Sequence, residues 1–284
     1  MKKQKLAVVF AALLTMVGFS SCLNSEDDGI REWGGYFEVN NTYGSVNFVD
    51  PTGIQLVPNK TIIDAPASSA LAYINYQYKD DDMAQIEQTK KLPVTLLQDP
   101  VYLKRLDCLT TTLPEETKTV SVYSLGERDA LVWGNNKYLI LAPTILLKKG
   151  TTSENLSTEL LNHRLTLYYL SAEGDEDANT LKLYLRYEIS GIGGSSTEET
   201  DDKESWASDY NVRYTNVSHV NLQPIISMYK STHSGSEPEK VTVEYEYNNS
   251  TSSIPTIAKK QTKTVTYNLY TETSSNNPNF RKQT

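Results

Sequence analysis

The feature that most constrains the fold of this chain is a period-two alternation of apolar and polar residues, which recurs in short segments along most of its length. Successive side chains of a β-strand point to opposite faces, so each such segment predicts a strand with one buried face. The alternation is clearest over 72–78, 118–125, 240–247 and 262–270. Other strand signals recur at 42–49, 54–57, 92–97, 130–147 (two strands), 163–170, 180–189 and 209–229. Helical periodicity is almost absent, so we predict an all-β chain made of sandwich or barrel modules.

The segments between these strands are mostly turns and loops. Residues 50–53 (Asp-Pro-Thr-Gly) predict a hairpin turn, as do residues 174–177. The segment 83–91 is expected to form a loop or one short helical turn, and 99–109 is the best helix candidate. The Gly-, Ser- and acid-rich segment 190–207 is expected to be a long loop.

The N-terminus has the layout of an export signal. Three lysines among the first five residues precede an apolar run over residues 6–19. A membrane-spanning helix needs about 20 apolar residues, so this run fits the central region of a secretory signal peptide instead. Ser20, Ser21 and Cys22 follow, and this ending resembles the lipobox of bacterial lipoproteins, with Phe19 in the place of the usual Leu.

The lipobox resemblance implies that residues 1–21 are removed as a signal peptide and that Cys22 is acylated. Several acyl chains together hold a protein firmly on a membrane, so the expected partner of Cys22 is the membrane. Residues 22–34 are then expected to be a lipidated tether. An acidic cluster in this tether resembles the export signal of Bacteroidetes surface lipoproteins, which favours the outer membrane and the cell surface over the alternative of a merely solvated linker. This cluster consists of Ser25, Glu26, Asp27 and Asp28.

Composition excludes several other classes of protein. The net charge is -8 and no basic stripe is present, so no nucleic-acid partner is expected. No second long apolar run follows the signal region, so no transmembrane helix is expected. The chain has 2 cysteines, so with Cys22 acylated an intramolecular disulfide cannot form and Cys108 remains single.

Few residues have the spacing that catalysis or metal binding requires. His163, His219 and His233 match no zinc-site pattern, and Cys108 is expected to be a small buried apolar residue. The run 80–82 (Asp-Asp-Asp) is expected to be a solvated loop, with a cation site as the alternative. Asp175, Asp177 and Asn179 match the first half of a calcium loop, but Thr180 and Arg186 stand where that loop has Gly and Glu, so a polar hairpin turn is favoured. We therefore predict no cofactor and no enzymatic activity.

Aromatic content is the one compositional feature that suits binding. The chain has 19 tyrosines beside 5 phenylalanines and 3 tryptophans. Four of the tyrosines lie on predicted strands with polar neighbours, namely Tyr73, Tyr168, Tyr184 and Tyr187. Packing against a sheet is the favoured interpretation, and exposure for stacking on a sugar or anchoring a partner is the alternative.

The order of motifs over about 40–190 resembles the NigD-like lipoproteins of Bacteroidetes. The matching residues are Tyr43, Val46, Phe48-Val49-Asp50, Gly53, Leu56 and Pro58, then Trp133-Gly134, Tyr138-Leu139, His163, Leu165, Leu167 and Leu183-Tyr184-Leu185-Arg186. Two departures are Tyr187, where the family often has His, and the continuation of the chain beyond about residue 220. The family has no established biochemical activity, so the resemblance supplies no catalytic residue.

The resemblance implies a small OB-like barrel over 35–112 and a β-sandwich over 113–272. The Ser- and Asn-rich tail over 273–284 is expected to be disordered. The expected function is a non-catalytic binding or interaction module of the cell envelope, with a protein or glycan partner. One alternative is a fimbrillin-like subunit that exchanges a strand such as 262–270 between protomers. A second is a glycan-binding accessory lipoprotein with an exposed aromatic platform. An enzyme would need a pocket that gathers His163, His219 or Cys108 with carboxylates.

Overall fold

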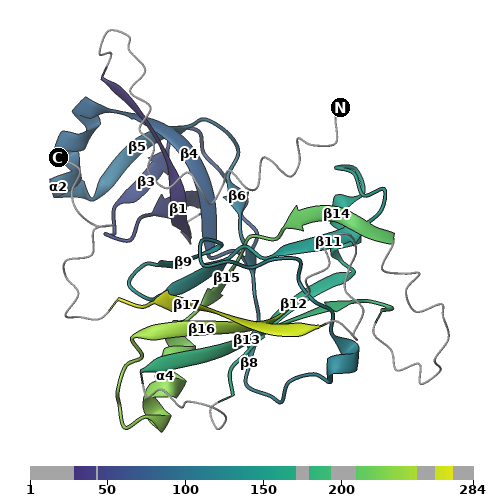
Figure 1. Ribbon diagram of the computed structural model, residues 1–284. Coiled ribbons are helices and arrows are strands. Elements are labelled where there is room, and N and C mark those ends of the chain that lie inside the picture. Colours follow the sequence, from purple (N-terminus) through teal and green to yellow (C-terminus); the bar gives the residue numbers. More distant parts are fainter. Residues whose placement is uncertain (1–28, 43, 171–178, 193–208, 248–259, 271–284) are drawn as a thin grey trace. The chain divides into compact units, whose positions relative to one another are not determined.

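The computed structural model describes residues 29–42, 44–170, 179–192, 209–247 and 260–270, and it is nearly all β (Figure 1). The chain divides between Arg105 and Leu106 into two compact units. We call the described residues up to Arg105 the barrel unit and those from Leu106 the sandwich unit. Among the helices of the described residues, none combines the length and apolarity needed to cross a membrane.

The barrel unit is a closed ring of five strands. They are β1 (Ile30–Thr42), β2 (Ser45–Val49), β3 (Gln55–Pro58), β4 (Leu71–Lys79) and β5 (Lys91–Leu96). The order β1-β2-β3-β5-β4 closes because β1 also pairs with β4, and only β3 and β5 run parallel. The short β6 (Val101–Tyr102) pairs with the start of β4. This ring confirms the predicted OB-like barrel.

The inside of the barrel is filled by alternate residues of its strands. Phe37, Phe48 and Ile74 are among its buried residues. Between β4 and β5 the chain forms a 3-10 helix, η1 (Asp80–Gln85), and the short helix α2 (Ile86–Thr89), which adds Ile86 to this core. For residues 83–91 the expectation was a loop or one short helical turn, and α2 confirms the helical turn. The run 80–82 was expected to be a solvated loop and instead begins η1.

The sandwich unit has a five-stranded sheet in the order β17-β16-β13-β12-β8. These strands are β8 (Cys108–Leu109), β12 (His163–Tyr168), β13 (Thr180–Ile189), β16 (Lys240–Tyr247) and β17 (Gln261–Asn268). A second layer includes β9 (Ala130–Trp133), β10 (Tyr138–Leu141) and β15 (Ser218–Asn221), together with the pair β11 (Thr144–Lys148) and β14 (Tyr210–Thr215). The predicted β-sandwich is therefore confirmed.

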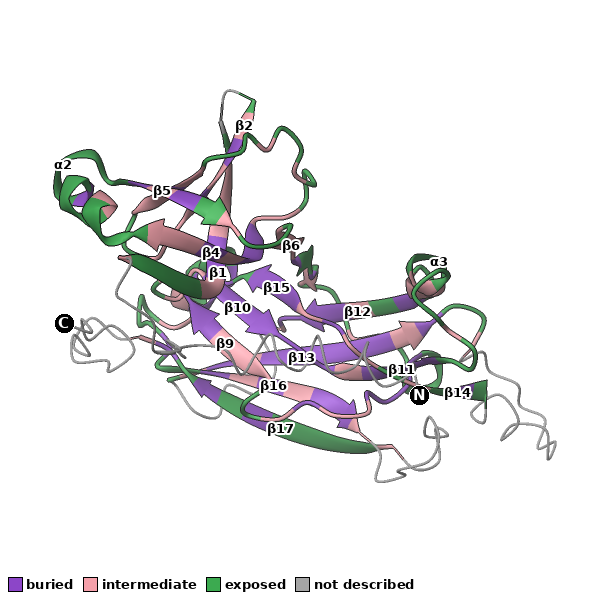
Figure 2. Ribbon diagram, turned by 90° about the horizontal axis from the view of Figure 1, so that it is seen from above, coloured by how far each residue is buried: buried purple, intermediate pink, exposed green. Residues whose placement is uncertain are grey.

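One large apolar core holds the sandwich unit together, and buried residues run along β10 and β13 in Figure 2. Leu139, Leu183 and Val243 are completely buried in this core. The short helices α3 (Leu156–Leu160) and η2 (Glu116–Lys118) lie on connections. The longer α4 (Gln223–Thr232) contributes Tyr229 to the core.

Several expectations about local structure were wrong. The segment 118–125 forms no strand and makes only isolated bridges, at Val120, Val122 and Ser124. The segment 130–147 contains three strands, β9, β10 and most of β11, instead of two. The segment 99–109 is not a helix but a series of two-residue strands, β6, β7 (Lys104–Arg105) and β8. An isolated helix of that length is only marginally stable. The backbone N–H of Leu103 bonds instead to the carbonyl of Leu71 in β4. Strand β1 begins at Ile30, inside the expected tether, because it pairs with β4 along its first nine residues. The segment 209–229 ends in α4, and Pro224 near the start of α4 is a typical helix-start signal.

Candidate functional site

An accessible cluster of aromatic and charged side chains lies at one end of the barrel unit. In the ladder between β1 and β4, Arg31 is opposite Tyr78 and Trp33 is opposite Tyr76. Residues two apart on a strand share a face, and directly opposed residues are close neighbours, so these four side chains lie on one face of the ladder. With Asp80, which follows the last residue of β4, they form what we call the barrel-end cluster.

The aromatic part of this cluster runs from the barrel core to solvent. The Tyr76 ring packs edge-on against Phe37, with ring centroids 5.7 Å apart, and Tyr78 follows at 6.2 Å from Tyr76. Trp33 lies opposite Tyr76 in the ladder and is 40 % exposed. The indole lies close to Gly35, since a Cβ placed on Gly35 would be 4.0 Å from the Trp33 Nε1 atom, an ordinary van der Waals contact. The cluster therefore presents a large ring to solvent on a rigid support.

The charged part of the cluster is a two-pronged ion pair. The Nε atom of Arg31 lies 3.2 Å and 3.0 Å from the two carboxylate oxygens of Asp80, and its Nη2 atom lies 2.9 Å from Oδ2. Both side chains are about half exposed. Burial and the Asp80 charge raise the pKa of Tyr78, against the opposing effect of Arg31. The Tyr78 phenol is therefore neutral at neutral pH and can both donate and accept a hydrogen bond.

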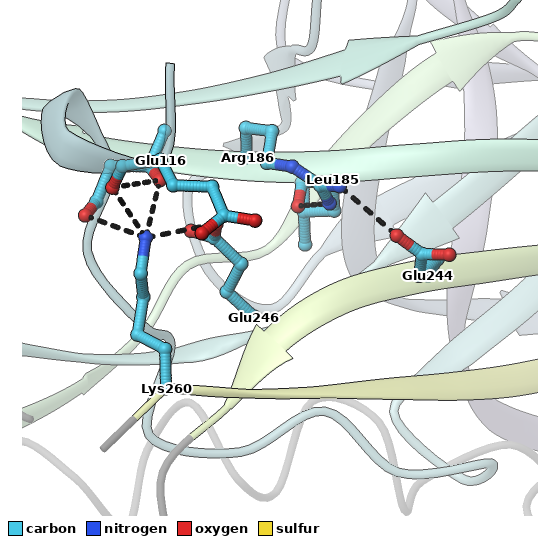
Figure 3. Close-up of polar contacts among 7 residues, drawn as sticks. Glu116, Leu185, Arg186, Glu244, Glu246 and Lys260 are labelled. Atoms are coloured by element: carbon cyan, nitrogen blue, oxygen red, sulfur yellow. Dashed lines mark hydrogen bonds and ion pairs between the residues drawn. The ribbon is translucent and has the colours of Figure 1, made fainter. Parts of the chain in front are cut away.

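A second polar cluster lies on the five-stranded sheet of the sandwich unit, on the face turned away from the core (Figure 3). Glu244 of β16 binds Arg186 of β13 through Nη2 at 3.0 Å and Lys182 of β13 through Nζ at 3.2 Å. The two cations also flank the Tyr184 ring, at 4.8 Å for Lys182 and 5.5 Å for Arg186. Arg186 and Tyr184 are buried, so this cluster is occupied by its own partners.

Next to it lies a lysine that is enclosed by oxygen atoms (Figure 3). The Lys260 ammonium lies 3.0 Å from Oε1 of Glu246, 2.8 Å from the Thr119 hydroxyl, 3.2 Å from the Thr119 carbonyl and 2.6 Å from the Glu116 carbonyl. The Lys260 and Glu246 side chains are only 8 % and 10 % exposed. The other carboxylate oxygen of Glu246 is buried without a hydrogen-bond partner among the described residues. This pair joins the edge of the sheet to the η2 connection, which is a structural role.

A third polar cluster has the arrangement of a catalytic relay. Nε2 of His163 lies 2.9 Å from Oε1 of Glu159, and Nδ1 lies 2.5 Å from the Tyr187 hydroxyl. Burial raises the pKa of Tyr187 well above its usual value, so the phenol is neutral. When Nε2–H of a neutral imidazole donates to Glu159, Nδ1 carries no proton and accepts from the phenol. A carboxylate, an imidazole and a hydroxyl thus stand in series, as in a nucleophile relay. Tyr187 is only 1 % exposed, however, so a substrate cannot reach its oxygen.

The other predicted candidates for chemistry are not brought together. Burial raises the pKa of the Cys108 thiol to about 12, which makes it a poor nucleophile at neutral pH. His219 is buried on β15 with its ring edge-on to Tyr138, and His233 stacks on Tyr229 at the end of α4. No group of three or more His, Cys, Asp or Glu residues suited to a metal ion occurs among the described residues, the acidic run 80–82 included.

The structure also places the tyrosines that could have formed a platform. Tyr73, Tyr168, Tyr184 and Tyr187 are all buried, so the packing interpretation is right for each of them. Within the part of the chain that the structure describes, the exposed aromatic side chain is that of Trp33, a residue expected to lie in the tether. Cys22, residues 25–28, Asp175, Asp177 and the tail 273–284 lie outside the described residues.

Several solved structures share this fold. A candidate lipoprotein from Bacteroides fragilis has 22 % sequence identity and a TM-score of 0.63, over 85 % of this chain and 99 % of that one. A protein of unknown function from Bacteroides vulgatus has 13 % identity and a TM-score of 0.50, over 88 % and 96 % of the two chains. A NigD-like immunity protein from Bacteroides caccae has 10 % identity and a TM-score of 0.45, over 81 % of this chain and 93 % of that one. No family model and no curated protein matches the chain.

Proposed function

We propose that this chain is a NigD-like lipoprotein of the bacterial cell envelope, anchored through Cys22, and that it acts as a non-catalytic binding module. The observation that carries the anchor is the order of lysines, short apolar run, Ser20, Ser21 and Cys22 at the N-terminus. The fold shared with a candidate lipoprotein from Bacteroides fragilis agrees with this proposal.

The binding role is supported by how the polar clusters differ in burial. In the sandwich unit, Arg186, Glu246 and His163 are buried and engaged by protein partners. At the barrel end, Trp33, Arg31 and Asp80 are exposed on a rigid ladder. A ligand can reach only the second set, so we place the binding function there.

The anchor is tested by replacing Cys22 with Ala. Cells expressing the wild type or Cys22→Ala are labelled with an alkyne analogue of palmitate, and the membrane fraction is extracted with detergent. We expect label and membrane retention for the wild type and neither for the variant. Equal labelling of the two chains would contradict the anchor at Cys22. Ser21→Ala is the matched control, because the position before the cysteine keeps a small residue.

The cell surface is proposed as the location because of the acidic residues that follow Cys22. Intact cells carrying a C-terminally tagged chain are treated with a protease, and the same is done with a triple variant, Glu26→Gln, Asp27→Asn and Asp28→Asn. We expect the tag to be lost from the wild type and kept in the variant. Protection of both chains would instead favour a periplasmic partner.

A second candidate function is a fimbrillin-like subunit that exchanges a strand between protomers. It is favoured by one observation: β17 is the edge strand of the five-stranded sheet, and most of its residues are exposed. An unpaired strand edge can accept another strand. Detergent-resistant oligomers that disappear on Val265→Pro would support this candidate, and a monomer in mild detergent would exclude it.

A further inference from the structure

We infer that the barrel-end cluster binds a neutral saccharide, with the Trp33 ring stacked on a sugar face and the Arg31–Asp80 pair bonded to ring hydroxyls. The inference rests on the proposed function, because it names the class of ligand for the proposed binding site. Three properties of the cluster support it: the exposure of its ring, the geometry of its polar groups and the sign of its charge.

The first property is the exposed ring. Among the described residues, Trp33 is the one aromatic side chain that is exposed, although the chain is rich in tyrosine. The C–H groups on one face of a pyranose are weakly positive and pack against the negative face of an aromatic ring. Indole offers the largest such face, and the pairing of β1 with β4 holds it in place. An exposed ring on a rigid strand costs little conformational entropy when it binds a ligand.

The second property is the presence of planar polar groups beside the ring. Arg31 is two residues from Trp33 on β1, and Asp80 engages its guanidinium with both carboxylate oxygens. A guanidinium carries five donors in a fixed plane, and a carboxylate has about four acceptor sites. Neighbouring hydroxyls of a sugar can therefore donate to Asp80 and accept from Arg31 together. The neutral Tyr78 phenol, which lies opposite Arg31, adds a group that can do either.

The third property is the charge around the cluster. The carboxylates of Glu32 and of residues 80–82 outnumber the cations of Arg31 and Lys79. A local excess of negative charge repels anionic ligands and attracts cationic ones. Uronic acids and sulfated sugars are therefore disfavoured, whereas neutral sugars are not. A basic peptide is the competing ligand class, but a basic peptide does not need an exposed tryptophan beside hydroxyl-binding groups.

The test is electrophoresis of the full chain, in mild detergent, through native gels that contain a polysaccharide. The neutral probes are starch, xylan, mannan and galactan, and the anionic probe is polygalacturonate. We expect retardation by at least one neutral probe and none by polygalacturonate. We expect Trp33→Ala to weaken that retardation at least tenfold, Trp33→Tyr to keep most of it, and Asp80→Asn to weaken it several-fold.

The matched control is Ile63→Ala, which removes an exposed apolar side chain of the same unit and is expected to change nothing. Thermal unfolding of each variant separates a lost site from a lost fold, and Trp33→Leu serves as a second variant if Trp33→Ala unfolds. Failure of all neutral probes, or retardation that is unchanged in both Trp33→Ala and Trp33→Leu, would overturn the saccharide inference.

The proposed function and the saccharide inference can fail separately. Fluorescence anisotropy with labelled oligolysine tests the competing ligand. Binding of oligolysine that Asp80→Asn and Trp33→Ala weaken, with no sugar binding, would keep the binding module and reject the saccharide. Failure of both ligands would reject the barrel-end site itself, while the anchor is tested independently by the Cys22→Ala labelling.

Discussion

The Arg31–Asp80 pair of the barrel unit and the Arg186–Glu244 pair of the sandwich unit use the same chemistry in opposite surroundings. The side chains of the first pair are 48 % and 45 % exposed, and those of the second are 10 % and 17 % exposed. Each pair also lies beside an aromatic ring, Tyr78 in the barrel and Tyr184 in the sandwich. The two clusters would look alike in a list of residue types.

The difference teaches that burial, not residue type, separates a binding cluster from a structural one here. An exposed pair contributes about 0–1 kcal/mol to stability, and its donors can be offered to a ligand. In the buried pair, loss of the Glu244 carboxylate would leave the Arg186 guanidinium buried without its counter-charge, and such a loss costs about 3–5 kcal/mol. Substitutions in the two regions should therefore affect different properties: stability in the sandwich unit and binding in the barrel unit.

The largest effect on stability is expected for Lys260→Met. This substitution leaves the Glu246 carboxylate buried without its counter-charge and removes the donor to the Thr119 hydroxyl. We expect the free energy of unfolding of the sandwich unit to fall by about 3–5 kcal/mol. Urea titration followed by circular dichroism measures this change.

The control for this prediction is the double variant Lys260→Met with Glu246→Leu. Replacing both charges with apolar groups removes the unpaired carboxylate, so most of the lost stability should return. A double variant that is as unstable as the single one would show that packing of the lysine stem, and not charge, matters at this site.

The next effect is expected for Tyr187→Phe, which removes the hydroxyl that bonds to Nδ1 of His163. Loss of one partner of a buried hydrogen bond costs about 1–3 kcal/mol. Tyr168→Phe on the neighbouring β12 is the matched control, because it removes a hydroxyl without altering the His163 contacts. Equal loss of stability in the two variants, measured by urea titration, would contradict a specific role for the Tyr187 hydroxyl.

Alternation made the strands β16 and β17 of the sandwich predictable. The predicted segment 240–247 is β16, and 262–270 covers β17 except for its first residue. Both strands have one face in the core, and burial of one face produces a period-two pattern of apolar residues in the sequence. Closure of the barrel produces no comparable sequence pattern, because the pairing of β1 with β4 depends on residues far apart in the chain.

The barrel-end cluster was missed for a related reason. Trp33 follows an acidic segment and precedes Gly34 and Gly35, which interrupt the alternation of β1. The structure explains Gly34, since a Cβ there would lie 2.2 Å from Oδ1 of Asn75 and 2.8 Å from the Tyr73 hydroxyl. Glycine inside a strand marks such a close approach, so the Gly-Gly pair was the signal that β1 begins earlier.

A smaller, pH-dependent effect is expected from Glu159. Burial alone would raise the pKa of this carboxyl, but the hydrogen bonds from His163 and from the Lys148 backbone N–H outweigh it and lower the pKa. A carboxyl whose pKa is lower in the folded chain adds stability above the pKa of the unfolded chain and loses it as the pH falls through the folded value. We therefore expect the free energy of unfolding to fall more steeply in acid for the wild type than for Glu159→Gln. Parallel acid profiles of the two chains in urea titrations would contradict this assignment.

The smallest stability effect is expected for Arg31→Gln. Its ion pair with Asp80 is exposed, so the free energy of unfolding should change by less than about 1 kcal/mol and the change should vanish in high salt. Arg186→Gln is the matched substitution in the sandwich unit, where the paired carboxylate of Glu244 is mostly buried, and there we expect a larger loss that salt does not remove. Urea titrations at low and high salt measure both. Because Arg31 also supplies donors to the proposed sugar site, Arg31→Gln should reduce retardation by a neutral polysaccharide and leave stability almost unchanged. Arg186→Gln should reduce stability and leave the retardation unchanged. Equal losses of stability in the two variants would mean that the exposed pair is as structural as the buried one, and the distinction between the two regions would fail.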